Sequence, residues 1–188
     1  MRNRDGVFSV REPPNTYLFQ DAFTAANGTN LTANGWSAES GTWTVDTNRA
    51  KSSLAGGICV YETGVANVYI RCTLNCTAGG TMGLSARYTD LNNNWLLGIE
   101  PGFGGIVIYE RSAGVLTLRT SVAAALSNGV DYIGTAILTG TSIRWAIAGF
   151  GEATYTSASH QSSTKHGLRC GLGGANDRWN DFCVGRMG

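Results

Sequence analysis

The stretch from Ala86 to Trp95 shows the pattern that most constrains the fold of this chain. An alternating run ends at Tyr88, a polar cluster follows from Asp90 to Asn94, and Trp95 begins the next run. Asp and Asn favour turns because their short side chains bond to the local backbone and tolerate left-handed conformations. Similar strand-turn-strand units recur through the rest of the chain, with turn residues about every eight to twelve positions. The chain is therefore expected to form an all-β, antiparallel sandwich of two sheets with almost no helix.

Two regions depart from this simple alternation. The first expected strand, residues 17–24, is followed by the next one only at residues 41–46. The Ala-rich run from Val122 to Leu126 favours a short helical turn, although it is too short to be stable as a helix alone. It is the one helical element that the pattern predicts.

Size and charge limit the classes of partner. With 188 residues, 43% of them hydrophobic, the chain suits one full-sized domain with an ample core. Charged residues make up 14% of the chain, well below the ordinary share of about 25%. The net charge of +1 gives no electrostatic footprint for nucleic acid, and no polybasic run is present for a membrane surface.

Residues 1–16 differ in composition from residues 17–188, which we expect to form the sandwich domain. A Pro-Pro pair cannot lie in a central strand and favours an extended conformation. We therefore expect residues 1–16 to be an extended arm that contacts neighbouring subunits. Its expected contact residues are three arginines and the proline pair: Arg2, Arg4, Arg11, Pro13 and Pro14.

The five cysteines are expected to be reduced. Cys72 and Cys76 lie four apart in a strand-like run, which would separate them by roughly 13 Å on one face. No Cys/His cluster has the spacing of a zinc site, so no metal or other cofactor is expected. The segment Met1–Asp5 lacks the apolar core of a secretory signal, and no run approaches membrane-spanning length, so we expect synthesis in the host cytoplasm.

A set of short motifs in a fixed order resembles the concanavalin A-like lectin and glucanase superfamily, particularly laminin-G-like jelly rolls of phage and bacterial surface proteins. The resemblance covers about residues 19–186 and is carried by Asp21–Phe23, Trp36, Gly41–Val45, Arg49, Ala86–Asp90, Asn92, Asn93, Trp95, Tyr109–Arg111, Gly114, Leu118, Gly140–Ile143 and Asp181–Val184. It implies a jelly-roll sandwich whose first and last strands lie side by side. The superfold hosts lectins, enzymes and structural modules alike, so the resemblance alone does not choose between them.

The acidic residues argue against catalysis. Glucanases of this fold place carboxylates alternately on one strand, about 5 Å apart. The acidic residues here are well separated, and neither His160 nor His166 lies near a glycine-framed serine. We therefore expect no catalytic residues and no enzymatic activity. The spacing of Asp90, Asn92 and Asn94 leaves two readings open, a calcium-binding loop or a turn closed by its own side chains.

Aromatic residues beside polar loops are the candidates for stacking on a sugar. Trp95 adjoins Asn92 and Asn94, and Trp179 adjoins Arg178, so these five residues form the candidate carbohydrate site. Trp43 and Trp145 are framed by small or apolar residues, and we expect them to lie in the core.

Two functions from different classes follow from this pattern. The main prediction is a non-catalytic structural protein of a phage virion, a capsid decoration or tail-associated jelly roll. It would be located in the virion and bind identical subunits and other virion proteins. The alternative is a carbohydrate-binding, lectin-like module, which could also serve host recognition. An exposed aromatic cluster on one sheet would favour the lectin, and a lateral surface engaged by identical copies would favour the structural role.

Overall fold

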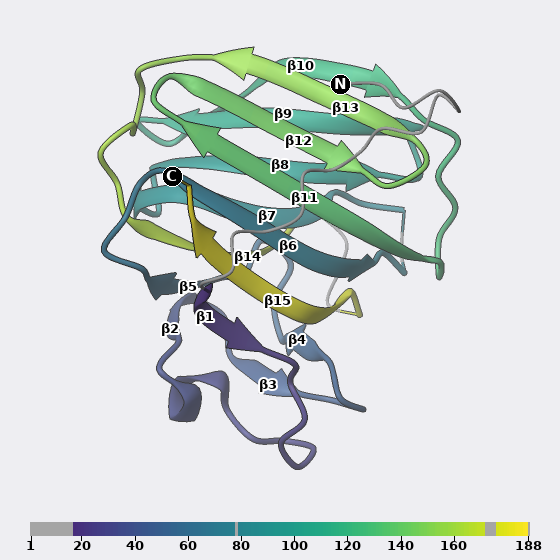
Figure 1. Cartoon of the computed structure of the whole chain (residues 1–188). Helices are drawn as coiled ribbons and strands as arrows, with labels where there is room; N and C mark the ends of the chain where they lie inside the picture. Colours follow the sequence, from purple (N-terminus) through teal and green to yellow (C-terminus); the bar gives the residue numbers. More distant parts are fainter. Residues whose placement is uncertain (1–16, 78, 172–175, 188) are drawn as a thin grey trace.

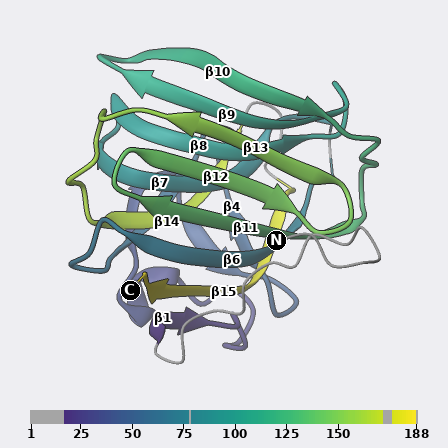
Figure 2. The same cartoon turned by 45° about the horizontal axis from the view of Figure 1, so that its top comes forward.

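A computed structural model describes residues 17–77, 79–171 and 176–187, and their strands form two antiparallel sheets (Figure 1). The eight-stranded sheet has the order β13 (Gly151–Thr156), β12 (Ser142–Ile147), β11 (Asp131–Thr139), β6 (Val68–Asn75), β15 (Arg178–Arg186), β4 (Ala50–Ser52) and β3 (Trp43–Val45), with β1 (Tyr17–Asp21) also paired to β15. The seven-stranded sheet has the order β10 (Val115–Ala123), β9 (Gly105–Ser112), β8 (Asn93–Glu100), β7 (Met82–Asp90), β14 (Lys165–Cys170), β5 (Ile58–Glu62) and β2 (Ser37–Ser40). Figure 2 shows the two sheets as layers of one sandwich.

The architecture confirms the predicted two-sheet antiparallel sandwich. Strand β1 pairs with β15, so the first and last strands lie side by side as expected. Within the described residues, the 3-10 turn η1 (Leu31–Asn34) is the one helical element, and no helix has the length and apolarity to cross a bilayer. Cys59 and Cys72 are buried and Cys183 is half-buried, and the expected reduced state of all five cysteines stays a prediction.

Two local predictions were wrong. Val122 and Ala123 belong to β10, because they pair with Ile106 and Gly105 of β9 and the cross-strand pairing outweighs the helix preference of alanine. Strand β2 was missed because its sequence, Ser-Ala-Glu-Ser, has no hydrophobic alternation. Its pairing with β5 places it at the edge of the seven-stranded sheet.

Tryptophans of the eight-stranded sheet cross the core to reach the seven-stranded sheet. Nε1 of Trp145 donates to the carbonyl oxygen of Gly98 at 2.8 Å, and Nε1 of Trp179 donates to that of Gly83 at 2.9 Å. Gly83 and Gly98 lie directly opposite each other in β7 and β8. The two bonds satisfy both buried indole donors, which burial alone would leave unpaired at a cost.

The residue of β11 that packs against the indole ring of Trp145 must be a glycine. A Cβ at Gly134 of β11 would collide with the indole ring of Trp145, whereas a Cβ at Gly105 would make only ordinary contacts. We expect Gly134→Ala to lower the free energy of unfolding by about 2 kcal/mol or more, because overpacking forces the ring from its position. The control Gly105→Ala should change it by less than about 1 kcal/mol. Urea denaturation measures both, and equal effects would contradict this account of the packing.

His166 is a fully buried histidine at the end of the sandwich. Its Nδ1 accepts a hydrogen bond from the backbone N–H of Arg87 at 3.2 Å, and its Nε2 lies 3.0 Å from the carbonyl oxygen of Val65. Burial lowers the pKa of His166 to about 4, and the nearby charge of Arg87 also lowers it. The imidazole is therefore neutral in the folded protein at neutral pH, with its proton on the nitrogen that faces Val65.

This burial predicts acid sensitivity. The unfolded chain protonates His166 near pH 6.5, while the folded chain resists protonation down to about pH 4, so the unfolded state binds more protons between these values. The free energy of unfolding should therefore fall by roughly 3 kcal/mol between pH 7 and pH 4 through this group. Urea midpoints of His166→Gln should depend less on pH over this range than those of the wild type. Above about pH 8 the imidazole of His166 is neutral in both states, so the two proteins should show the same pH dependence there.

Candidate functional site

The two tryptophans predicted to stack on sugar are both buried. Trp95 and Trp179 have no exposed surface. Nε1 of Trp95 donates to the carbonyl oxygen of Ser159 at 3.1 Å, and its ring packs against Tyr155 and His160. Each tryptophan occupies an inward position of its strand, and a polar loop nearby in sequence does not change that. The prediction for Trp95 and Trp179 was wrong, while Trp43 and Trp145 lie in the core as expected.

The polar turn before Trp95 is closed by its own side chains. Oδ1 of Asp90 accepts hydrogen bonds from the backbone N–H of Asn92 at 2.7 Å and from Nδ2 of Asn93 at 2.9 Å. These bonds lower the pKa of Asp90, with that from Asn93 contributing most. Nδ2 of Asn94 instead donates to the Asp90 carbonyl oxygen. The structure therefore favours the turn over the calcium loop, and the described residues contain no metal-ligating group of three His, Cys, Asp or Glu side chains.

Arg178 lies at a different place in the fold from this turn. Its Nη2 donates to Oδ2 of Asp46 at 2.8 Å, and its Nη1 donates to the Asn176 carbonyl oxygen at 2.6 Å. Lys51 also lies 3.7 Å from the same Asp46 oxygen. An open hollow of about 530 Å³ adjoins these residues, lined by Asn27, Gly28, Thr42, Thr44, Val45, Asp46, Lys51, Ser53 and Asn176. Its charged side chains pair with one another or with Arg178, which makes the hollow a weaker candidate for ligand binding.

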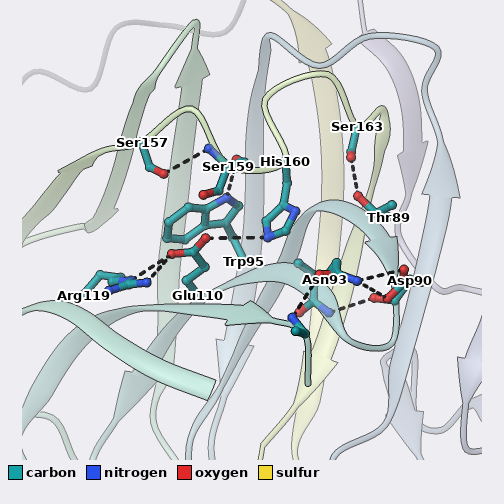
Figure 3. A network of polar contacts seen from close by, with 12 residues as sticks. Thr89, Asp90, Asn93, Trp95, Glu110, Arg119, Ser157, Ser159, His160 and Ser163 are labelled. Atoms are coloured by element: carbon teal, nitrogen blue, oxygen red, sulfur yellow. Dashed lines mark hydrogen bonds and ion pairs between the residues drawn. The ribbon is translucent and has the colours of Figure 1, made fainter. Parts of the chain in front are cut away.

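A second polar network joins the β13–β14 loop to strands of the seven-stranded sheet. Figure 3 shows Glu110 beside the Trp95 ring, between Arg119 and His160. The buried Glu110 carboxylate pairs with Nη2 of Arg119 at 2.8 Å, and its other oxygen lies 3.8 Å from Nε2 of His160. Thr89 and Ser163 share a hydroxyl hydrogen bond of 2.6 Å nearby. These contacts tie the β13–β14 loop to β7, β8, β9 and β10, so the network is structural.

The outer face of the seven-stranded sheet carries a group of buried polar side chains. On β8, Trp95, Leu97 and Ile99 belong to the core, so Asn94 and Glu100 face outward. Oδ1 of Asn94 accepts a hydrogen bond of 2.6 Å from Nη1 of Arg169, which reaches it from β14 across β7. Arg111 of β9 is the direct cross-strand partner of Asn94. Together with Ser85 of β7, the residues Asn94, Arg111 and Arg169 form what we call the Asn94 cluster.

An aromatic and apolar strip lies beside the Asn94 cluster. Tyr109 is two residues before Arg111 and pairs with Leu118 of β10, which is 47% exposed. The Tyr109 hydroxyl donates to Oε1 of Glu100 at 2.8 Å, and Thr81 donates to the same oxygen at 2.6 Å. Burial, followed by the bond to Glu100, raises the pKa of Tyr109 to about 12, so its hydroxyl stays protonated. A half-buried ring with a fixed hydroxyl is thus held between an apolar edge and a charged cluster.

Sequence reasoning found one member of this site and missed the others. Asn94 was predicted, but Ser85, Tyr109, Arg111 and Arg169 were not. Asn92 is exposed in the turn, and its backbone N–H rather than its side chain bonds to Asp90. Only the pairing of β14 with β7 and of β7 with β8 brings Arg169 to Asn94. The alternation within each strand could have shown which side chains face outward, but not which of them meet.

The comparisons with known proteins support the same fold. No family model and no curated protein sequence matches the chain. Among solved structures, the carbohydrate-binding module CBM66 from Bacillus subtilis is similar with a TM-score of 0.61 and 12% identity, over 81% of this chain and 92% of that one. The CBM2 module of the evolved Dit of Lactobacillus casei BL23 phage J-1 is similar with a TM-score of 0.56 and 11% identity, over 89% and 94%.

An enzyme is also among the similar structures, but the similarity covers only part of it. A mutant of the GH43 protein BlXynB from Bacillus licheniformis has a TM-score of 0.64 and 14% identity, and the match covers 89% of this chain but 38% of that one. At these identities the similarities establish the fold. The chain has the concanavalin A-like jelly-roll sandwich that its motifs predicted.

The closed turn at Asp90 predicts how the protein responds to calcium. Asp90→Ala removes the hydrogen-bond acceptor of the turn and should lower the melting temperature. Asn92→Ala leaves the backbone N–H that bonds to Asp90 in place and should have a smaller effect. Millimolar calcium should not shift the melting temperature of the wild type. A calcium-dependent shift that disappears in Asp90→Ala would revive the metal-site reading.

Proposed function

We propose that this chain is a non-catalytic carbohydrate-binding module that holds a glycan on the outer face of the seven-stranded sheet. The observation that carries the proposal is the arrangement on that face. A ring and exposed leucines form one strip, and planar amide and guanidinium groups form the next. Sugar rings have apolar C–H faces and hydroxyl edges, so this pairing of surfaces suits them. The similarity of the fold to CBM66 and to the phage J-1 module supports the proposal.

The alternative prediction is therefore favoured over the main one. A structural role through contacts with identical subunits and other virion proteins has no support in the similar structures, apart from the phage source of one module. The arm residues Arg2, Arg4, Arg11, Pro13 and Pro14 lie outside the described residues, so their contacts stay a prediction. A location in the virion is compatible with glycan binding, since a virion protein could present this module to its host.

The carboxylates of this region support binding over hydrolysis. Glu100 and Glu110 come from neighbouring strands, but Glu100 faces outward whereas Glu110 lies in the network beside the inward-facing Trp95. Each is also held by its own partners, Thr81 and Tyr109 for Glu100 and Arg119 for Glu110. A retaining glycosidase needs two carboxyl groups about 5 Å apart on the same side of a substrate. This pair does not face one substrate.

Glycan binding can be tested with an array followed by calorimetry. The wild-type chain should bind at least one class of glycan. Tyr109→Ala and Leu118→Ala should each weaken that binding by about tenfold or more, since each removes contact surface from the aromatic and apolar strip. The control Ile133→Ala removes a side chain that is 38% exposed on the other sheet and should leave binding unchanged. Binding that Ile133→Ala weakens and Tyr109→Ala spares would place the site on the other sheet.

A further inference from the structure

Arg169 is a buried cation that forms no ion pair with any described carboxylate. It is only 6% exposed. Its Nη1 bonds to the neutral amide of Asn94, and its Nε is buried with no hydrogen-bond partner. Among the described residues no carboxylate lies within ion-pair distance of it, although seven such pairs involve other side chains. Burying a charge without a counter-ion lowers the stability of the fold, so a functional reason for Arg169 is worth seeking.

Arg111 adds a second positive charge at the same place. It stands directly across from Asn94, and its one hydrogen bond within the described residues runs from Nε to the Gly114 carbonyl oxygen at 3.2 Å. Burial, followed by repulsion from Arg111, lowers the pKa of Arg169 to about 10. Arg169 therefore remains charged at neutral pH. The fold holds Arg111 and Arg169 together, and the part of the chain that the structure describes pairs neither of them with a carboxylate.

The carboxylates of this face are engaged elsewhere. Glu100 accepts hydrogen bonds from Thr81 and Tyr109. Glu39 accepts from the Tyr88 hydroxyl at 3.1 Å and lies 3.9 Å from Nζ of Lys165. The two arginines are thus left for a partner from outside the described fold.

Ser85 supplies a third unpaired polar group. Its Oγ is fully buried and has no hydrogen-bond partner. Ser85 faces Gly167 of β14 and Leu96 of β8, so it lies on the path that Arg169 follows to Asn94. Gly83, Gly98 and Gly167 lie at neighbouring outward positions and carry no side chain. Ser85 is thus the one polar side chain at these neighbouring positions of β7 and β14, beside the apolar Leu96.

We infer that the Asn94 cluster binds the anionic group of an acidic glycan, either a uronate carboxylate or a sulfate ester. The inference rests on the proposed glycan-binding function and specifies its ligand class. Arg111, which is half-buried, is the accessible member, while Arg169 supplies a second fork of donors held in place by Asn94. Guanidinium groups bind carboxylates and sulfur or phosphorus oxyanions through paired N–H donors. A neutral hydroxyl accepts fewer of these hydrogen bonds and carries no charge, so it binds a guanidinium less strongly.

Arg87 is a second buried arginine, and its surroundings differ from those of Arg169. Arg87 also lacks a carboxylate and has an unpartnered Nη1, but it has no exposed surface. Its Nε and Nη2 reach the Ala66 carbonyl and the Asn67 side-chain oxygen at 3.4 Å. Arg87 is therefore enclosed by a loop, whereas the Asn94 cluster lies on a sheet face with an accessible arginine beside it.

Matched polymers with and without charge test the inference. Polygalacturonate is compared with its methyl-esterified form, and dextran sulfate with dextran, by calorimetry at one ionic strength. The charged member of at least one pair should bind about tenfold or more tightly than the uncharged member. Arg111→Gln and Arg169→Gln should each abolish most of that preference, and Arg169→Lys should retain part of it. The pair that shows the preference distinguishes a carboxylate ligand from a sulfate.

The control is Arg71→Gln, which removes an exposed arginine from the outer face of the other sheet and should leave the preference intact. If Arg169→Gln fails to fold, Arg111→Gln decides, because Arg111 makes few internal contacts. A preference that Arg71→Gln reduces as much as Arg111→Gln reflects general charge attraction and overturns the inference. Equal binding of charged and neutral polymers, weakened by Tyr109→Ala, would overturn the inference and leave the proposed function standing. Binding of no glycan at all would overturn both.

Discussion

Two indole hydrogen bonds join the sheets of this sandwich at its centre, and the outer surface depends on them. Trp179 and Trp145 donate to the carbonyl oxygens of Gly83 and Gly98, which face each other in β7 and β8. A Cβ at Gly83 would collide with the carbonyl oxygen of Leu97, so the backbone geometry there requires glycine. The same glycines that serve the core therefore leave two facing outward positions of β7 and β8 without side chains. The interior and the exterior of the sheet are coupled through one pair of residues.

That bare strip determines how the charged groups are arranged. Arg169 can lie flat across β7 to reach Asn94 because no side chain at Gly83 or Gly167 blocks it. A guanidinium lying along the sheet is fixed in direction, and its charge is brought beside that of Arg111. A binding face built in this way is organised before any ligand arrives, which reduces the entropy lost on binding.

The sequence predicted the strands and turns well because the alternation and the Asp/Asn turns are local signals. The prediction that Trp43 and Trp145 lie in the core was correct. The prediction that Trp95 and Trp179 are exposed was wrong, because a polar loop next to a tryptophan does not determine which face of the sheet its side chain occupies. Most residues of the candidate site could not be predicted from the sequence. Arg169 is 75 positions from Asn94, and only the register of three strands brings them together. Asn94 was identified, but from its turn rather than from its partner.

The position of the last strand has a consequence for how the chain folds. Strand β15 lies inside the eight-stranded sheet, with β6 along one edge and β1 and β4 sharing the other. The sheet therefore cannot close during synthesis until residues 178–186 have left the ribosome, and the earlier strands wait with unpaired edges. Pairing of distant segments is slow and exposes such edges to other chains. Protection of the nascent chain by a chaperone would matter more for this topology than for one whose last strand lay at an edge.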